Sequence, residues 1–412
     1  MPKKRIAFVV NYFYPDLAST GQLMTELCFD LIEDFDITVI AAQPGYAGET
    51  VQTKKRYEVE YLENGIKVIR IKLPSVKKTS KWSRIKYITS YFIFALIALI
   101  REKNIDIIYT ISQPPILGGL IGTIGKFFKR KKHLYNIQDF NPEQAEAVNY
   151  TNNKLIYKFA IKLDKLNCKY ADQIVLVGND MVETLKNRFK KGNVPNYTVI
   201  NNWINENEVT PLPENTDEIE KFKEKYGLRN KFVVMYSGNI GLYYDLENII
   251  SVAEQFTQKD IIFLFIGDGA KKKELEEYVN NHRLENVMFL PYQPKDFIKY
   301  SLNVGDLHLV VNQKGIKGVS VPSKIYGVMA VGKPILGVIE EGSEAERLIT
   351  KSRSGVVVEP HKYNEIVEKI TYFYKLNKNK RSEIGLRGRR YLETYLTKEL
   401  SITKYKKILK NL

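Results

Sequence analysis

The chain has 412 residues, of which 44% are hydrophobic, so it is long enough for two domains of about 200 residues each. Its 2 cysteines and 4 histidines show no metal-ligand spacing, which argues against a structural zinc site and a disulfide-stapled fold. The formal net charge of +16 fits contact with nucleic acid, anionic lipid or a phosphorylated substrate, although a solvated lysine-rich surface would carry the same charge.

The first half alternates predicted strands with predicted helices. Residues 6–10 and 37–41 are short apolar runs, and residues 22–32 between them have the pattern of an amphipathic helix. This β-α-β start is typical of a doubly wound α/β sheet. Gly21 would let the backbone approach a ligand, but the G-x-G-x-x-G motif is absent, which disfavours a dinucleotide-binding dehydrogenase.

Residues 77–101 form the most membrane-like segment. A basic start leads into the run YITSYFIFALIALI, whose length of about 14 residues is below the roughly 20 that span a bilayer. One interpretation is a core helix. The other is a helix that also rests on an anionic membrane surface, with Lys81, Trp82, Arg84 and Lys86 at the headgroups.

A strand predicted at residues 133–137 runs into two carboxylates, Asp139 and Glu143. Ligands of an open parallel sheet bind at the carboxyl ends of its strands, so both residues are candidates for a functional role. Either carboxylate could take a proton from an acceptor hydroxyl or orient it. The alternative is that Asp139 only caps the next helix.

The alternation restarts after a polar, proline-containing linker at residues 205–215. Strands predicted at 232–237 and 261–266 each run into a glycine turn, Gly238-Asn239-Ile240-Gly241 and Gly267-Asp268-Gly269. Where a strand passes into a helix through such a turn, backbone N–H groups can face a phosphate.

Residues 318–337 combine a turn, a short apolar helix and a buried strand. At the helix start, the Ser323 hydroxyl and the Lys324 cation would meet free backbone N–H groups, a combination that indicates an anion site. Residues 327–333 also have the P-loop spacing G-x-x-x-x-G-K, but Pro334 replaces the required Ser or Thr and the preceding segment is helical, so a P-loop is disfavoured. The sequence is best explained if the anion is the diphosphate of a nucleotide-sugar.

Five ordered segments carry a family resemblance: NYFYPDLASTGQL, IQDFNPEQ, YSGNIGLYYDLENII, FIGDGAKKKELE and VPSKIYGVMAVGKPILGVIEEGSEAERLI. They resemble the GT-B glycosyltransferases of the family 4 retaining branch, and within it the bacterial surface-polysaccharide enzymes similar to N-acetyl-L-fucosamine and colanic acid transferases. The resemblance implies an α/β fold of two Rossmann-like, doubly wound domains that face each other across a cleft. The expected domains are an acceptor-binding domain (1–204), a nucleotide-sugar-binding domain (205–385) and a C-terminal helix (386–412) that crosses back to the first.

The resemblance also implies the reaction. A sugar, expected to be N-acetylated, would pass from a UDP-sugar to an undecaprenyl-diphosphate-linked saccharide during O-antigen or capsule synthesis, with no cofactor and no metal. Helix N-termini and cationic side chains would stabilise the leaving diphosphate instead. The enzyme would be cytoplasmic and attached peripherally to the inner face of the cell membrane, because no signal peptide precedes the first strand and the acceptor is a lipid.

The family's motifs assign the site residues. Asp139 falls at the acceptor-side catalytic position, and Glu143 is the second choice. The expected donor-binding residues are Gly21, Gly238, Asn239, Gly241, Gly267, Asp268, Gly269, Pro322, Ser323, Lys324, Tyr326 and Glu344.

This chain departs from the family at four positions. The Arg and Lys that hold the diphosphate in many members are replaced by Asn239 and Tyr244, and the E-x7-E pair falls on Val319 and Gly327. We expect Lys324 to supply the missing cation and Glu344 to replace a ribose-binding glutamate.

Two other functions compete. A UDP-sugar 2-epimerase of the same fold would need cleft histidines, but the four histidines, His133, His282, His308 and His361, do not stand at matching strand ends. A nucleic-acid-binding protein would suit the basic composition, but no recognised nucleic-acid module is visible.

Overall fold

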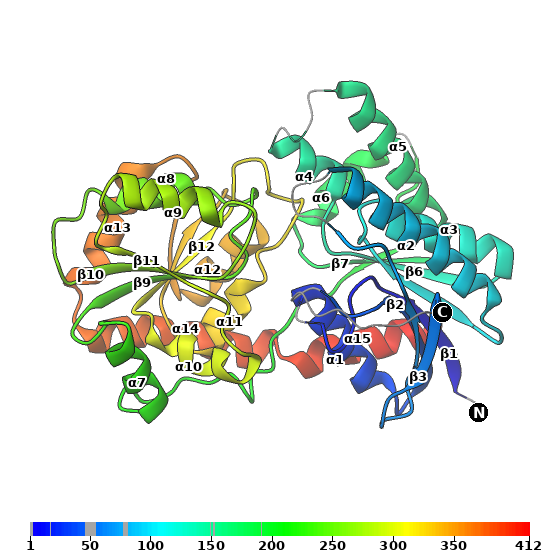
Figure 1. Ribbon diagram of the computed structural model, residues 1–412, viewed down its shortest axis with the longest axis horizontal. Helices are drawn as coiled ribbons and strands as arrows, with labels where there is room; N and C mark the ends of the chain where they lie inside the picture. Colours follow the sequence, from blue (N-terminus) through cyan, green and yellow to red (C-terminus); the bar gives the residue numbers. More distant parts are fainter. Residues whose placement is uncertain are drawn as a thin grey trace. The chain divides into compact units, whose positions relative to one another are not determined.

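The computed structural model describes residues 3–16, 18–45, 55–76, 81–148, 150, 153–190 and 192–412 (Figure 1). The chain divides into two compact units. Unit 1 comprises Met1–Glu146, Thr151–Asn201 and Ser401–Leu412, and unit 2 comprises Ala147–Tyr150 and Asn202–Leu400. The main division therefore falls slightly before the predicted boundary at residue 204.

Unit 1 is built on an eight-stranded sheet in the order β3-β4-β2-β1-β5-β6-β7-β8. All neighbouring strands are parallel except β3 and β4, which form an antiparallel hairpin. The strands are β1 (Lys4–Val9), β2 (Phe35–Ala42), β3 (Tyr57–Tyr61), β4 (Lys67–Ile71), β5 (Ile107–Ile111), β6 (Lys132–Ile137), β7 (Gln173–Leu176) and β8 (Tyr197–Val199).

Three helices form one layer on this sheet, because α2 packs against α3 and α3 packs against α5 (Figure 1). The helices of this part of the chain are α1 (Ser19–Leu31), α2 (Lys81–Arg101), α3 (Leu117–Lys129), α4 (Asn141–Ala147), α5 (Lys154–Tyr170) and α6 (Met181–Arg188). The predicted helix at 22–32 thus begins earlier, at Ser19.

Helix α2 is longer than its apolar run suggested. Its segment Trp82–Arg101 is long and apolar enough to cross a membrane by length and composition, yet Tyr91, Ala95, Ala98 and Leu99 are buried in the core of unit 1. Only 22% of the apolar stretch of this helix is buried, so most of the helix lies outside that core. The helix therefore combines a core-packing face with an exposed face.

Unit 2 is built on a six-stranded parallel sheet in the order β11-β10-β9-β12-β13-β14. Its strands are β9 (Phe232–Ser237), β10 (Ile261–Ile266), β11 (Val287–Leu290), β12 (Leu307–Val311), β13 (Ile335–Val338) and β14 (Gly355–Val358). Its helices are α7 (Asp217–Lys225), α8 (Leu246–Ala253), α9 (Lys272–Asn281), the 3-10 turn η1 (Lys295–Phe297), α10 (Ile298–Val304), α11 (Lys324–Ala330), α12 (Glu344–Ser352), α13 (Tyr363–Lys375) and α14 (Lys378–Tyr395).

The C-terminal segment expected at 386–412 contains the end of α14 and the whole of a further helix, α15 (Lys398–Asn411). Helix α14 belongs to unit 2, and the chain returns to unit 1 only within α15, from Ser401 onward. The buried Tyr405 of α15 accepts a hydrogen bond from Asn136 Nδ2 at 2.7 Å, and Lys406 forms an ion pair with Asp34. These contacts fix α15 to the sheet of unit 1.

Candidate functional site

Two glycine turns lie against each other at the carboxyl ends of β9 and β10. The N–H of Gly238 donates to the carbonyl of Ile266 at 2.9 Å, and the N–H of Ile240 donates to the carbonyl of Asp268 at 2.9 Å. A Cβ on Gly267, whose φ is +156°, would lie only 1.9 Å from the carbonyl oxygen of Gly238. Only glycine allows this approach, so the predicted turns form a single double-turn platform.

The second glycine of each turn completes the platform. A Cβ on Gly269 would lie 2.2 Å from the carbonyl oxygen of Ile240, and one on Gly241 would lie 2.8 Å from Asn239 Nδ2. The side chains of Asn239 and Asp268 are exposed on it, with Asp268 Oδ1 accepting the Gly269 N–H at 2.8 Å. Six predicted donor residues are therefore brought together, namely Gly238, Asn239, Gly241, Gly267, Asp268 and Gly269.

Lys324 reaches this platform from the start of α11. Its Nζ donates to the Tyr236 hydroxyl at 2.6 Å and lies 3.9 Å from the ring centres of both Tyr236 and Tyr244. A Cβ on Gly238 would lie 3.4 Å from Lys324 Cε. The sequence predicted the lysine, but not the aromatic sandwich that holds it.

The electrostatic surroundings of Lys324 are unusual for a lysine. Within the part of the chain that the structure describes, no carboxylate lies at ion-pair distance from its Nζ. Burial lowers the pKa of this ammonium group well below its usual value. A bound anion beside it would restore a favourable environment for the charge, so the arrangement is suited to holding a phosphate group.

The remaining donor candidates of unit 2 differ in their surroundings. Ser323 is exposed next to Lys324, whereas Pro322 is buried and Tyr326 is buried in the core beneath α11. Glu344 is 1% exposed, and both of its carboxylate oxygens accept from Arg347. The structure thus gives this carboxylate a partner within its own helix. Val319 and Gly327, where the E-x7-E pair would fall, are both buried.

Gly21 belongs to unit 1. A Cβ there would lie 2.9 Å from the Cβ of Tyr12, and Thr25 Oγ1 donates to the Gly21 carbonyl at 2.8 Å. The glycine therefore lets the start of α1 pack closely on the loop after β1.

Asp139 follows β6 directly and is half-buried. Its N–H donates to Ser112 Oγ at 3.2 Å, and Gln144 Nε2 donates to its Oδ1 at 3.4 Å. Ser112 follows β5, the neighbouring strand, so the Asp139 carboxylate is held at the carboxyl edge of the sheet. This position is compatible with contact to a substrate.

Glu143, the second catalytic candidate, forms a structural ion pair instead. Arg188 donates to its two oxygens at 2.8 and 2.6 Å, and the same guanidinium lies 2.6 Å from Asp164. Arg188 also stacks over Phe140, 4.3 Å from the ring centre. A carboxylate held in this way is poorly suited to proton transfer. The arginine partner lies 45 residues further along the chain, and nothing in the sequence indicates the pairing.

The predicted membrane patch lies at the start of α2. Trp82 is 79% exposed, and Arg84 and Lys86 are exposed too, whereas the side chain of Lys81 lies outside the described residues. The exposed tryptophan fits a surface contact and does not fit a core helix at this end.

The histidines are not grouped around either site. His133 and His308 are buried, and burial lowers the pKa of each to about 3. His133 Nε2 lies 2.8 Å from Thr110 Oγ1, and His308 Nε2 lies 3.0 Å from the carbonyl of Leu302. Among the described residues, no group of three or more His, Cys, Asp or Glu could hold a metal ion.

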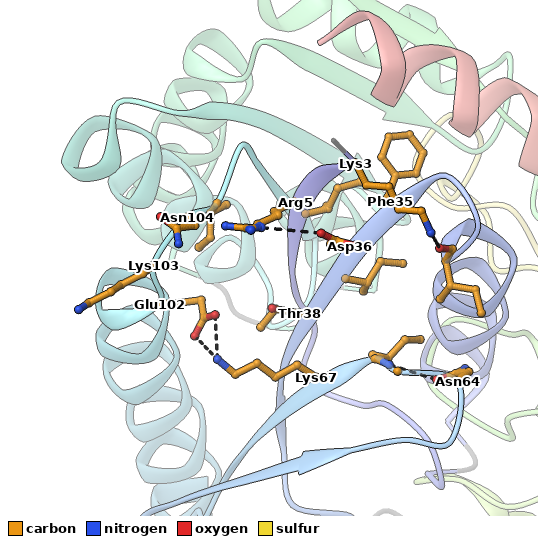
Figure 2. A pocket seen from close by; sticks show the side chains of 16 residues that line it. Lys3, Arg5, Phe35, Asp36, Thr38, Asn64, Lys67, Glu102, Lys103 and Asn104 are labelled. Atoms are coloured by element: carbon orange, nitrogen blue, oxygen red, sulfur yellow. Dashed lines mark hydrogen bonds and ion pairs between the residues drawn. The ribbon is translucent and has the colours of Figure 1, made fainter. Parts of the chain in front are cut away.

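A cavity of about 570 Å³ lies at the amino ends of the unit 1 strands, beside the first residues of β1 and β2 (Figure 2). Its charged side chains largely pair with one another: Lys67 with Glu102 at 2.7 Å, and Arg5 with Asp36 at 3.7 Å. Because it lies at the amino ends of these strands, it is separate from the edge that carries Asp139.

Comparisons with known proteins agree with this geometry. Residues 218–391 match the family model "Glycosyl transferases group 1". The chain is 29% identical to a probable glycosyltransferase, WbjE, of Pseudomonas aeruginosa over 85% of this chain and 84% of that protein. It is 25% identical to the putative colanic acid biosynthesis glycosyl transferase WcaI of Escherichia coli K12, over 96% of this chain and 97% of that one.

Solved structures share the fold at low sequence identity. Sucrose-phosphate synthase of Thermosynechococcus elongatus superposes with a TM-score of 0.77 and 14% identity, covering 99% of both chains. Anabaena HepE, solved in complex with UDP and glucose, superposes with a TM-score of 0.72 and 15% identity, also covering 99% of both. The predicted two-domain α/β fold is confirmed. Residues 218–391 form a glycosyl transferases group 1 domain, and the chain is a glycosyltransferase of the GT-B fold.

Proposed function

We propose that this glycosyltransferase moves a sugar from a UDP-sugar to a lipid-diphosphate-linked saccharide in the synthesis of a bacterial surface polysaccharide. The donor half rests on the Lys324 ammonium, which lies beside the double-turn platform and has no carboxylate at ion-pair distance among the described residues. The resemblance to WcaI, which is named for colanic acid biosynthesis, supports a polysaccharide product. An N-acetylated sugar is the donor we propose, on the subgroup resemblance of the sequence motifs.

The donor half of the mechanism concerns the leaving diphosphate. As the bond between the sugar and the diphosphate breaks, negative charge grows on the phosphate oxygens. Lys324 would donate to those oxygens, and the platform of Gly238 and Gly267 leaves room for them to approach the backbone closely. The Tyr236 hydroxyl, whose pKa burial raises well above its usual value, stays protonated and keeps the lysine in place. The donor site needs no metal in this scheme.

The acceptor half is assigned to Asp139. Its carboxylate would orient the attacking hydroxyl of the acceptor or receive its proton, the role that positioned carboxylates have in general base catalysis. Ser112 and Gln144 hold it in position.

A lipid-linked acceptor requires the enzyme to work at a bilayer. The exposed Trp82 with Arg84 and Lys86 is suited to the interface of an anionic membrane, where an aromatic ring and cations bind together. We therefore place the enzyme in the cytoplasm, bound peripherally to the inner face of the cell membrane.

The donor site is tested by thermal melting with UDP, GDP or UDP-GlcNAc in EDTA. A ligand that binds only the folded protein raises the melting temperature. We expect a shift with UDP that Lys324→Ala removes and that Lys351→Ala, an exposed lysine of the same unit, retains. A shift with GDP alone would replace the donor, and no shift with any nucleotide would overturn the proposed site.

A further inference from the structure

Helix α5 of unit 1 carries an apolar stripe on its outer side. Leu155, Phe159, Leu166 and Tyr170 recur at spacings of four and seven residues, so they lie along one side of the helix. They are 76%, 68%, 39% and 36% exposed, whereas Tyr157, Asp164, Asn167 and Cys168 form the buried side. An amphipathic helix in a soluble domain normally turns such a stripe toward the core.

A second stripe, of lysines, runs beside the first. Lys154, Lys158, Lys162, Lys165 and Lys169 recur at spacings of three and four residues. The single acid of the helix, Asp164, is buried and paired with Arg188. Among the described residues, no carboxylate lies at ion-pair distance from Lys154, Lys158 or Lys162. The exposed side of α5 therefore carries apolar residues and lysines, and no acidic residue.

The surface continues onto α3. Phe127 packs edge-on against Tyr170, with 5.2 Å between ring centres, and Phe127 and Phe128 are 56% and 72% exposed. A hollow of about 360 Å³ beside them is lined by Lys126, Arg130, Lys131 and Lys132 together with Asp106 and Asp172. Both acids are paired with lysines, so the hollow keeps a positive charge.

These observations identify the occupant by its chemistry. A protein partner would have to supply a surface both apolar and acidic, whereas an anionic bilayer supplies acyl chains and phosphate groups in one plane. Helix α5 has 17 residues and is about 25 Å long, which is long enough to lie along such a plane. Helices α2, α3 and α5 belong to the same layer of unit 1 (Figure 1). Helix α2 carries the exposed Trp82 near its start.

We propose that the outer face of α5, with Phe127 and Phe128 of α3, is a docking surface for anionic lipid. Leu155 and Phe159 would enter the region between headgroups and acyl chains, while the lysine stripe would bind lipid phosphates. The inference rests on the proposed function, since a lipid-linked acceptor gives the enzyme its reason to bind a bilayer.

The test is co-sedimentation of the full chain with vesicles of phosphatidylcholine, with and without an equal part of phosphatidylglycerol. We expect binding only to the anionic vesicles and release at high salt, because screening weakens the attraction. The variant Lys154→Glu/Lys158→Glu/Lys162→Glu should bind about a hundredfold more weakly, since each lysine near an anionic surface contributes about fivefold. Leu155→Ser/Phe159→Ser should also bind less.

Two control variants carry comparable charge and apolar changes at exposed positions of unit 2. Lys221→Glu/Lys375→Glu/Lys380→Glu alters the net charge equally, and Tyr372→Ser/Tyr395→Ser removes exposed aromatic surface. Both should bind vesicles like the unaltered protein. Equal loss in the controls, or full binding by the α5 variants, would overturn the proposal.

Self-association through this stripe, and failure of the proposed donor, can each be distinguished from lipid binding. If the stripe is instead an interface between copies, light scattering will show an oligomer that Leu155→Ser/Phe159→Ser converts to a monomer, and the lipid proposal is then wrong. The α5 variants should keep the melting shift with UDP. Loss of that shift in every protein would refute the proposed donor while leaving the vesicle result intact.

Discussion

At the scale of single residues, the chemistry depends on how Lys324 is held. The lysine has no carboxylate at ion-pair distance among the described residues, and two tyrosine rings and one hydroxyl surround its Nζ. Tyrosine rings tolerate a cation without neutralising it, whereas a carboxylate would compete with the phosphate of the donor. We therefore propose that Lys324 compensates for the two family cations that Asn239 and Tyr244 replace.

The lowered pKa of Lys324 predicts that UDP binding takes up a proton. A bound diphosphate raises the pKa of the Lys324 amine again. At a pH above the lowered pKa of the free protein, this amine is neutral and must take up a proton when UDP binds. The affinity for UDP then falls as pH rises, by at most about tenfold per pH unit. Calorimetry in buffers of different ionisation heat measures the uptake. The control is Lys324→Arg, which stays protonated, and equal proton uptake in both proteins would contradict the prediction.

Asp139 and Glu143 are expected to separate into one catalytic and one structural carboxylate. Asp139→Asn should lower kcat about 10²–10⁴-fold with little loss of stability. Glu143→Gln should keep most of the activity but reduce the free energy of unfolding by about 1–3 kcal/mol, because the buried Arg188 loses a charged partner. Rate assays and urea unfolding of both variants check this, and the reverse pattern would show that the roles are exchanged.

At the scale of elements, the proposed donor site depends on two turns whose close approach requires glycine. Gly267→Ala would push a Cβ to 1.9 Å from the carbonyl oxygen of Gly238. We expect a loss of about 2–4 kcal/mol in the free energy of unfolding, together with weaker UDP binding. Gly192→Ala, where a Cβ meets nothing within 4 Å, should change stability by less than about 1 kcal/mol. Urea unfolding tests the pair, and an unchanged Gly267→Ala protein would contradict the packing described.

Sequence patterns predicted most elements because parallel strands are continuous apolar runs with glycine turns at their ends. The sequence also singled out the two turns and Lys324, which the structure brings together. Sequence patterns could not reveal a partner far along the chain: Arg188 forms the ion pair with Glu143, 45 residues away.

At the scale of the whole molecule, we propose that each unit contributes one half of the reaction. Unit 2 carries the double-turn platform and Lys324, and unit 1 carries Asp139 and the exposed faces of α2 and α5. The chain returns to unit 1 through α15, whose Tyr405 is buried beside Asn136. This distribution of the proposed donor and acceptor groups agrees with the proposed transfer from a UDP-sugar to a lipid-linked saccharide.

The measurement that tests this account most directly is transfer of radiolabelled sugar from UDP-GlcNAc and other UDP-sugars to lipid-diphosphate-linked saccharides in anionic vesicles, with EDTA present. The account predicts label in the lipid fraction with the unaltered protein and with Lys351→Ala, and loss of transfer with Lys324→Ala and Asp139→Asn. A UDP-sugar that is only epimerised or hydrolysed, or transfer that persists without Lys324, would contradict it.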